Sequence, residues 1–248
     1  MSNAFALITH KPQEIYFDFL NKFTKYDIYV IIDDNLKDYT YLNTKYTNIT
    51  FVQIDNTVLH NTGFINCSRI GDKITTGYGW DKAVYFFSNI KKNEYKNVWY
   101  SEEDVFFYDE NTLLTIDQKY EDYDILCNSS FEDGKLDEWM WNSINICLDP
   151  PYYCGMMCCC RFSQKMFEKI NEYVSKNKTL FFIEALFPTI AKKNNLKYCV
   201  NPEEFLTITY RNVFEMTQFD RNTLYHPMKN LQNHIVTRDY LSTQNKNK

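Results

Sequence analysis

The amino-acid sequence predicts a single α/β domain with a mostly parallel central sheet flanked by helices, and a smaller mixed region in its second half. Two patterns support this prediction: apolar runs of strand length alternate with segments of helical periodicity, and several of the runs end in acidic or polar residues. The length of 248 residues suits one such domain. We expect the domain to cover residues 1–241 and residues 242–248 to form a disordered tail.

The composition excludes several classes of protein. Hydrophobic residues make up 44% of the chain and charged residues 24%, as in ordinary globular proteins. A net charge of -5 speaks against a broad nucleic-acid-binding surface. No apolar run reaches membrane-spanning length, and the first residues do not resemble a signal peptide. The 8 cysteines lack paired metal-ligand spacing, so we expect buried free thiols in a cytoplasmic protein.

The first half of the chain contains the clearest strands. Apolar runs at 4–9, 27–32, 50–54 and 97–101 have strand length. Between the first two runs, Pro12 and the apolar residues that follow it at helical spacing predict a helix. A second helix is expected to open at Asp81, and a third follows the last of these runs at 110–118.

The second half mixes shorter elements. We expect strands at 123–127 and 155–160 and a helix that begins at Ser163. Another helix is expected at 184–194, where Pro188 is tolerated only near the first turn.

Polar residues follow the predicted strands of the first half. His10, Asp33 and Asp55 each come directly after an apolar run, as does the triplet Glu102-Glu103-Asp104. In an open, mostly parallel sheet the carboxyl ends of the strands meet at one edge, where ligands bind. The sequence therefore predicts a binding site at this edge.

The acidic triplet is the strongest single motif. Residues two apart on an extended segment share a face, so Glu102 and Asp104 are expected to point the same way. Such a carboxylate pair suits Mn²⁺ or Mg²⁺. The alternative is an exposed acidic turn, which the apolar residues at 105–107 make less favourable.

Three other segments support a family resemblance. Gly-Trp-Asp-Lys-Ala stands at 79–83, a glycine-containing strand followed by Arg-Phe-Ser stands at 154–163, and Tyr-His-Pro-Met-Lys stands at 225–229. In this order and with the triplet, they resemble the nucleotide-sugar-dependent glycosyltransferases of GT-A fold, which is Rossmann-like. The triplet resembles that family's metal motif in a Glu-x-Asp variant. The resemblance covers residues 4–230.

The resemblance implies an activity. A sugar, in the hexosyltransferase class, would move from a nucleoside-diphosphate sugar, with UDP-sugars favoured, to a hydroxyl of a glycan or other acceptor. Residues 1–110 would form the nucleotide-binding half and 111–241 the acceptor-side half. Glu102 and Asp104 would hold Mn²⁺ or Mg²⁺ with His226 as a third ligand, and Lys229 would pair with the diphosphate. Without the resemblance, His226 is a turn residue and Lys229 a solvated lysine.

Further residues are expected on the nucleotide side. The resemblance implies that the loop after the first strand touches the base and ribose. Asp33 or Asp34 can accept hydrogen bonds from the ribose or the base, or can simply end a strand in a turn. Lys82, near a helix start, can reach phosphates. The predicted nucleotide-binding residues are Thr9, His10, Lys11, Asp33, Asp34, Lys82, Glu103 and Lys229.

Transfer with inversion requires a base that deprotonates the acceptor hydroxyl. The candidates are Glu184, Asp137 and Glu138. Glu184 lies in an apolar run, where burial raises the pKa of a carboxyl, although it can equally be a helix-start acid. Transfer with retention needs no dedicated base.

Two alternatives stay open from the sequence. One is a catalytically inactive GT-A-like module that binds a nucleotide or a glycan. The other is a sugar-nucleotidyltransferase, which the absence of glycine from the loop after the first strand disfavours.

Overall fold

The computed structural model describes residues 1–68, 77–130, 144–146 and 148–244. Six strands of this part of the chain form one sheet in the order β3-β2-β1-β4-β6-β5. The strands are β1 (Ser2–Thr9), β2 (Tyr26–Ile32), β3 (Ile49–Gln53), β4 (Tyr95–Glu102), β5 (Ile125–Asn128) and β6 (Met156–Ser163). In this described sheet β1 to β4 are parallel, and β6 runs antiparallel to both of its neighbours. The predicted α/β fold with a mostly parallel sheet is confirmed.

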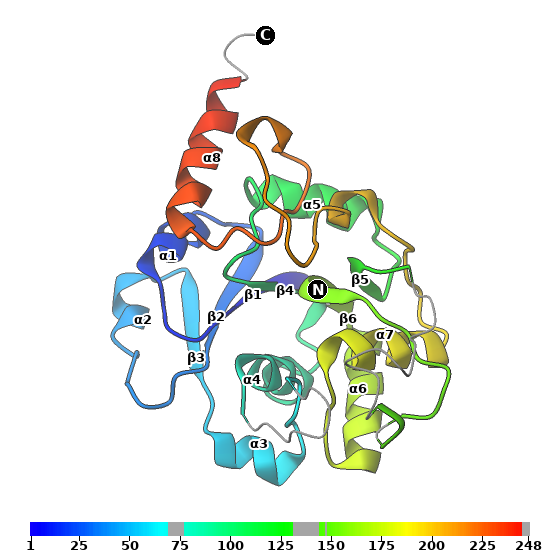
Figure 1. Cartoon of the computed structure of the whole chain (residues 1–248). Coiled ribbons are helices and arrows are strands. Elements are labelled where there is room, and N and C mark those ends of the chain that lie inside the picture. The colour runs from blue at the N-terminus through cyan, green and yellow to red at the C-terminus, as the bar shows by residue number, and fades with distance from the viewer. Residues whose placement is uncertain (69–76, 131–143, 147, 245–248) are drawn as a thin grey trace.

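Helices cover both faces of the sheet (Figure 1). They are α1 (Glu14–Leu20), α2 (Leu42–Lys45), α3 (Asn56–Thr62), α4 (Gly79–Tyr85), α5 (Glu110–Lys119), α6 (Gln164–Asn177), α7 (Ile183–Lys193) and α8 (Leu231–Gln244). A π-helical turn at Phe86–Ile90 continues α4. None of the described helices is long and apolar enough to cross a bilayer.

The pleat of β1 explains why both faces are covered. Ala4, Ala6 and Ile8 join the core under α4, α6 and α7, whereas Phe5 and Leu7 join the core under α1 and α5. Alternate side chains of a strand point to opposite faces, so an uninterrupted apolar run needs apolar partners on both sides. β1 is therefore an interior strand of the sheet, and its carboxyl end lies between the carboxyl ends of β2 and β4.

Several predicted boundaries shift in the structure. The helix expected from Asp81 begins at Gly79, and Asp81 is the third helical residue, accepting from the N–H of Tyr78. Ser163 caps α6 as predicted. The final helix reaches Gln244, so residues 242–244 are helical rather than part of a disordered tail.

The run Cys158 to Cys160 is a buried part of β6, as predicted, and all three thiols are free. Burial raises the pKa of each of these thiols. They are therefore neutral packing groups of the sheet.

Candidate metal centre and active-site cleft

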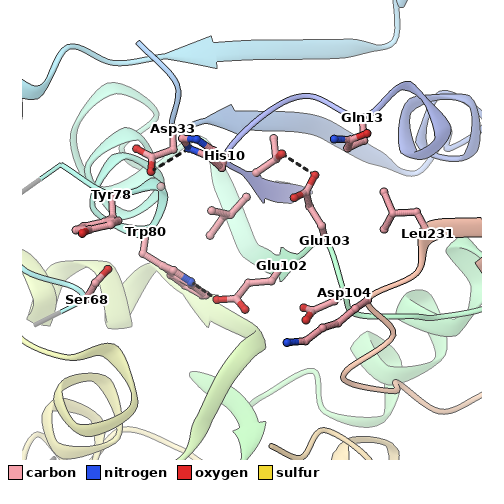
Figure 2. A pocket seen from close by; sticks show the side chains of 14 residues that line it. His10, Gln13, Asp33, Ser68, Tyr78, Trp80, Glu102, Glu103, Asp104 and Leu231 are labelled. Atoms are coloured by element: carbon pink, nitrogen blue, oxygen red, sulfur yellow. Dashed lines mark hydrogen bonds and ion pairs between the residues drawn. The ribbon is translucent and has the colours of Figure 1, made fainter. Parts of the chain in front are cut away.

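The acidic triplet lies where β4 ends. Glu102 is the last residue of the strand, and Asp104 lies in the turn that follows, closed by a hydrogen bond from the Val105 N–H to the Glu102 carbonyl (3.3 Å). The sequence analysis expected strand alternation to point both carboxylates the same way. Instead the strand ends at Glu102, and the turn that follows brings the Asp104 carboxylate to the same side. Figure 2 shows both side chains pointing into the same space, while Glu103 turns away from them.

A distant segment brings His226 to this turn. Tyr225 pairs with Phe106 through two backbone hydrogen bonds of 2.8 and 2.9 Å, and the Met228 N–H donates to the Asp104 carbonyl (2.7 Å). The segment 225–228 therefore runs antiparallel to 104–106 and brings the imidazole of His226 to the side chain of Asp104. Its Nε2 is 3.3 Å from Oδ1 of Asp104.

The orientation of the imidazole is set by its other nitrogen. Nδ1 of His226 lies 2.6 Å from the carbonyl oxygen of Thr209, which can only accept, so Nδ1 carries the proton. Nε2 points at the carboxylates. Burial lowers the pKa of the imidazole, but the contact with Asp104 outweighs this effect and the pKa is raised, so Nε2 can hold a proton that a cation would replace. A second ring nitrogen fixed in this way is typical of metal-ligating histidines.

One ligand atom each from Glu102, Asp104 and His226 lies within 4.8 Å of the others. Burial raises the pKa of Glu102, an effect that Asp104 adds to and the Trp80 hydrogen bond opposes. For Asp104, burial is outweighed by the His226 contact, so its pKa is lowered. The donor set of two carboxylates and one imidazole fits Mn²⁺ or Mg²⁺, because a cation would relieve the repulsion between the carboxylates.

Glu102 and Asp104 line a cavity of about 680 Å³ at the carboxyl ends of β1, β2 and β4 (Figure 2). The cavity is an open cleft between the strand ends and the start of α8. Its lining residues are Ile8, Thr9, His10, Gln13, Asp33, Ser68, Tyr78, Gly79, Trp80, Glu102, Glu103, Asp104, Lys229 and Leu231.

A second cavity of about 340 Å³ adjoins the first. It adds a mainly apolar wall and one carboxylate, Glu184. The two cavities share Ser68, Trp80, Glu102, Asp104 and Lys229. The carboxylate pair thus stands at the junction of a polar compartment and a more apolar one.

Five of the predicted nucleotide-side residues line the first cavity: Thr9, His10, Asp33, Glu103 and Lys229. The Thr9 hydroxyl donates to Oε1 of Glu103 (2.6 Å), and burial raises the pKa of this glutamate. Nδ1 of His10 lies 3.9 Å from Oδ2 of Asp33. His10, Asp33 and Glu103 lie above Glu102 and Asp104 in Figure 2, along one side of the cleft.

Three other predicted residues do not line either cavity. Lys82 is fully buried, and its ammonium group donates to the carbonyl of Asp33 (2.6 Å) and pairs with that residue's Oδ1 (3.0 Å). Asp34 accepts from the hydroxyl of Tyr39 (2.8 Å) and from a backbone N–H in its own turn, and Lys11 is exposed. In this arrangement Lys82 supports Asp33 instead of facing the cleft.

No protein-family model matches the chain, and no curated protein is similar to it in sequence. Solved structures with a similar fold include the galactosyltransferase LgtC in complex with donor and acceptor sugar analogs (14% identity, 98% of this chain and 96% of that one, TM-score 0.46). Another is mouse xyloside xylosyltransferase 1 (11%, 81% and 85%, 0.45). A third is 4-diphosphocytidyl-2C-methyl-D-erythritol synthase from Anaerococcus prevotii (12%, 97% and 95%, 0.47). The chemistry of the site is derived below from this chain's own residues.

Of the three candidate bases, Glu184 lies among the residues that the structure describes. It is the second residue of α7 and lines the second cavity, where burial raises its pKa to about 7, with Glu102 adding to the shift. Asp137 and Glu138 lie outside the described residues.

Several lining residues were not predicted as site residues. Trp80 belongs to the Gly-Trp-Asp-Lys-Ala segment and carried a signal, since that motif resembled the family. Gln13, Ser68, Tyr78 and Tyr210 stand in no recognisable motif, and they reach the cleft through chain packing.

Proposed function

We propose that this chain is a metal-dependent glycosyltransferase that moves a sugar from a nucleoside-diphosphate sugar to a hydroxyl acceptor. The observation that carries the proposal is the position of Glu102, Asp104 and His226 at the junction of two cavities. A diphosphate has to lie between its nucleoside and its sugar, so a cation at this junction would contact the group that links the two.

The polar compartment suits the nucleoside. Lys82 occupies Oδ1 of Asp33, which leaves Oδ2, on the side of His10, to accept a hydrogen bond. Uracil presents an N–H donor flanked by two carbonyl acceptors, and His10 can donate to one of them. This match favours a UDP-sugar, with Thr9 and Glu103 beside the ribose.

The second compartment suits the transferred sugar and the acceptor hydroxyl. In transfer with inversion, the acceptor oxygen bonds to the anomeric carbon, the bond from that carbon to the diphosphate breaks, and Glu184 takes the hydroxyl proton. A carboxyl with a pKa of about 7 is matched to that task near neutral pH. A cation held by Glu102, Asp104 and His226 would stabilise charge on the departing diphosphate, and Lys229 would add a positive charge from the shared wall.

The test combines ligand binding and turnover. Mn²⁺ with UDP is expected to raise the Tm of the wild type more than the sum of the two separate effects, because each ligand binds better in the presence of the other. Glu102→Ala with Asp104→Ala should abolish this cooperativity. The matched control is Glu121→Ala with Asp122→Ala, which removes two carboxylates at exposed positions, 67% and 84% accessible.

Turnover separates the alternatives. The wild type should slowly hydrolyse a UDP-sugar without acceptor, faster than GDP- or TDP-sugars. Cooperative binding without any turnover would indicate an inactive binding module. Release of pyrophosphate from UTP and a sugar phosphate would indicate a nucleotidyltransferase, and no Tm shift with any nucleotide would overturn the proposal.

A further inference from the structure

Three consecutive residues at the start of α4 connect three parts of the site. Trp80 donates to Glu102 at the end of β4, Asp81 accepts from the backbone of Cys67, and Lys82 binds Asp33 after β2. Successive residues of a helix point about 100° apart, so one turn can reach three different segments.

The position of this turn is tightly constrained. A Cβ on Gly79 would stand 2.7 Å from the Ile8 side chain, so glycine allows the helix start to approach β1 closely. Trp80 is 7% exposed, and its ring packs on Tyr100 with 5.5 Å between ring centroids. The indole is therefore held in place before any ligand arrives.

The indole N–H of Trp80 donates to Oε1 of Glu102 at 2.7 Å (Figure 2). We propose that Trp80 is a positioning residue that presents Glu102 to the cation through one oxygen and thereby selects a small six-coordinate cation over Ca²⁺. This inference rests on the metal site of the proposed function. It concerns how that site chooses its ion.

His226 has the same property. Nδ1 of His226 faces the Thr209 carbonyl, so this residue also offers one atom. With Oε1 of Glu102 engaged by Trp80 and one oxygen taken from Asp104, the three residues would offer three of the six ligands that Mn²⁺ or Mg²⁺ requires. Phosphate and water oxygens would supply the rest. Ca²⁺ takes six to eight oxygens and commonly uses both oxygens of a carboxylate, which the indole denies it here.

The test measures ion binding, not turnover. The wild type and Trp80→Phe are titrated with Mn²⁺ in the presence of UDP, and electron paramagnetic resonance measures the free Mn²⁺. The titration is then repeated with Ca²⁺ as competitor. Phe keeps the ring wall and removes the donor. We expect Trp80→Phe to weaken Mn²⁺ binding about tenfold and to bind Ca²⁺ no more weakly than the wild type, so that the Mn²⁺ to Ca²⁺ affinity ratio falls.

Tyr100→Phe is the matched control, since it keeps the ring that packs on the indole and removes a hydroxyl that faces the Ala83 carbonyl and no carboxylate. Its affinity ratio should equal that of the wild type. If Trp80→Phe does not fold, 3-benzothienylalanine at position 80 keeps the ring shape and removes only the N–H. An unchanged affinity ratio in a folded position-80 variant overturns the inference and leaves the proposed function standing. A wild type that binds no Mn²⁺ with UDP overturns both.

Discussion

The carbonyl oxygen of Glu184 accepts a hydrogen bond from the backbone N–H of Gly155 (3.0 Å), across the gap between α7 and the segment before β6. Pro188 explains why this oxygen is available. It is the sixth residue of α7 and not in the first turn as expected, and it has no N–H to donate to the carbonyl four residues earlier. The proline therefore frees a backbone acceptor at the candidate base, and Gly155 uses it.

Gly155→Ala is expected to disturb this connection. The added Cβ would stand 2.8 Å from the Cβ of Ser129 and 3.2 Å from Sγ of Cys127, so the start of β6 has to shift. We expect a loss of about 1–3 kcal/mol in the free energy of unfolding, measured by urea denaturation. Turnover should fall with Mn²⁺ affinity unchanged, because the shift acts on Glu184 and not on the metal ligands. A variant with wild-type stability would contradict the packing argument.

Glu184→Gln should change how activity depends on pH. With a pKa of about 7, the wild-type carboxyl becomes a base as pH rises through neutrality, so kcat should rise over this range. The amide cannot accept the proton, and we expect kcat to fall about 10²–10⁴-fold with loss of that limb of the profile. A variant with full kcat would remove Glu184 from the role of base and favour transfer with retention.

The same substitution predicts a stability effect without substrate or metal. The pKa of Glu184 is raised from 4.5 in the unfolded reference to about 7 in the fold, so the folded state holds the proton more tightly. The wild type therefore loses stability relative to Glu184→Gln as pH rises from 4.5 to 7, by on the order of 1–3 kcal/mol, and the difference persists above pH 7. Tm measured at pH 5 and pH 8 in EDTA checks this, and equal differences at the two values would refute it.

Lys82→Met is expected to destabilise the fold by about 3–5 kcal/mol, because it leaves Asp33 with no buried cation. Adding Asp33→Asn should recover part of the loss, as a double-mutant cycle in urea would show. Lys11→Met is the control at an exposed lysine and should stay within about 0.5 kcal/mol of the wild type. Equal effects of the two lysine substitutions would mean that Lys82 is not a structural partner of Asp33.

His226→Ala should weaken Mn²⁺ binding about tenfold or more by removing the nitrogen ligand. The Tm increase produced by Mn²⁺ with UDP should shrink accordingly. His60→Ala, at an exposed histidine of α3, serves as the control and should keep the full increase. An undiminished increase in His226→Ala would exclude the imidazole from the metal site.

Local patterns in the sequence were sufficient for the sheet and for the position of the acidic triplet. In β1, β2 and β4 nearly every residue is buried, because these strands are covered on both faces, and such strands appear in the sequence as continuous apolar runs. The final helix escaped prediction because its buried face consists largely of polar residues, His234 and Thr237 with Leu241. A hydrophobic pattern does not report such a face.

The amino-acid sequence by itself determined the class of fold and the strand end at which Glu102 and Asp104 stand, because periodicity and strand ends are local properties of the chain. Tertiary structure alone decided that His226 lies against Asp104, that Trp80 holds one oxygen of Glu102, and that Lys82 lies buried beneath Asp33. The physical reason is that hydrogen bonds, ion pairs and burial depend on which distant segments pack together. Spacing along the chain does not encode those distances.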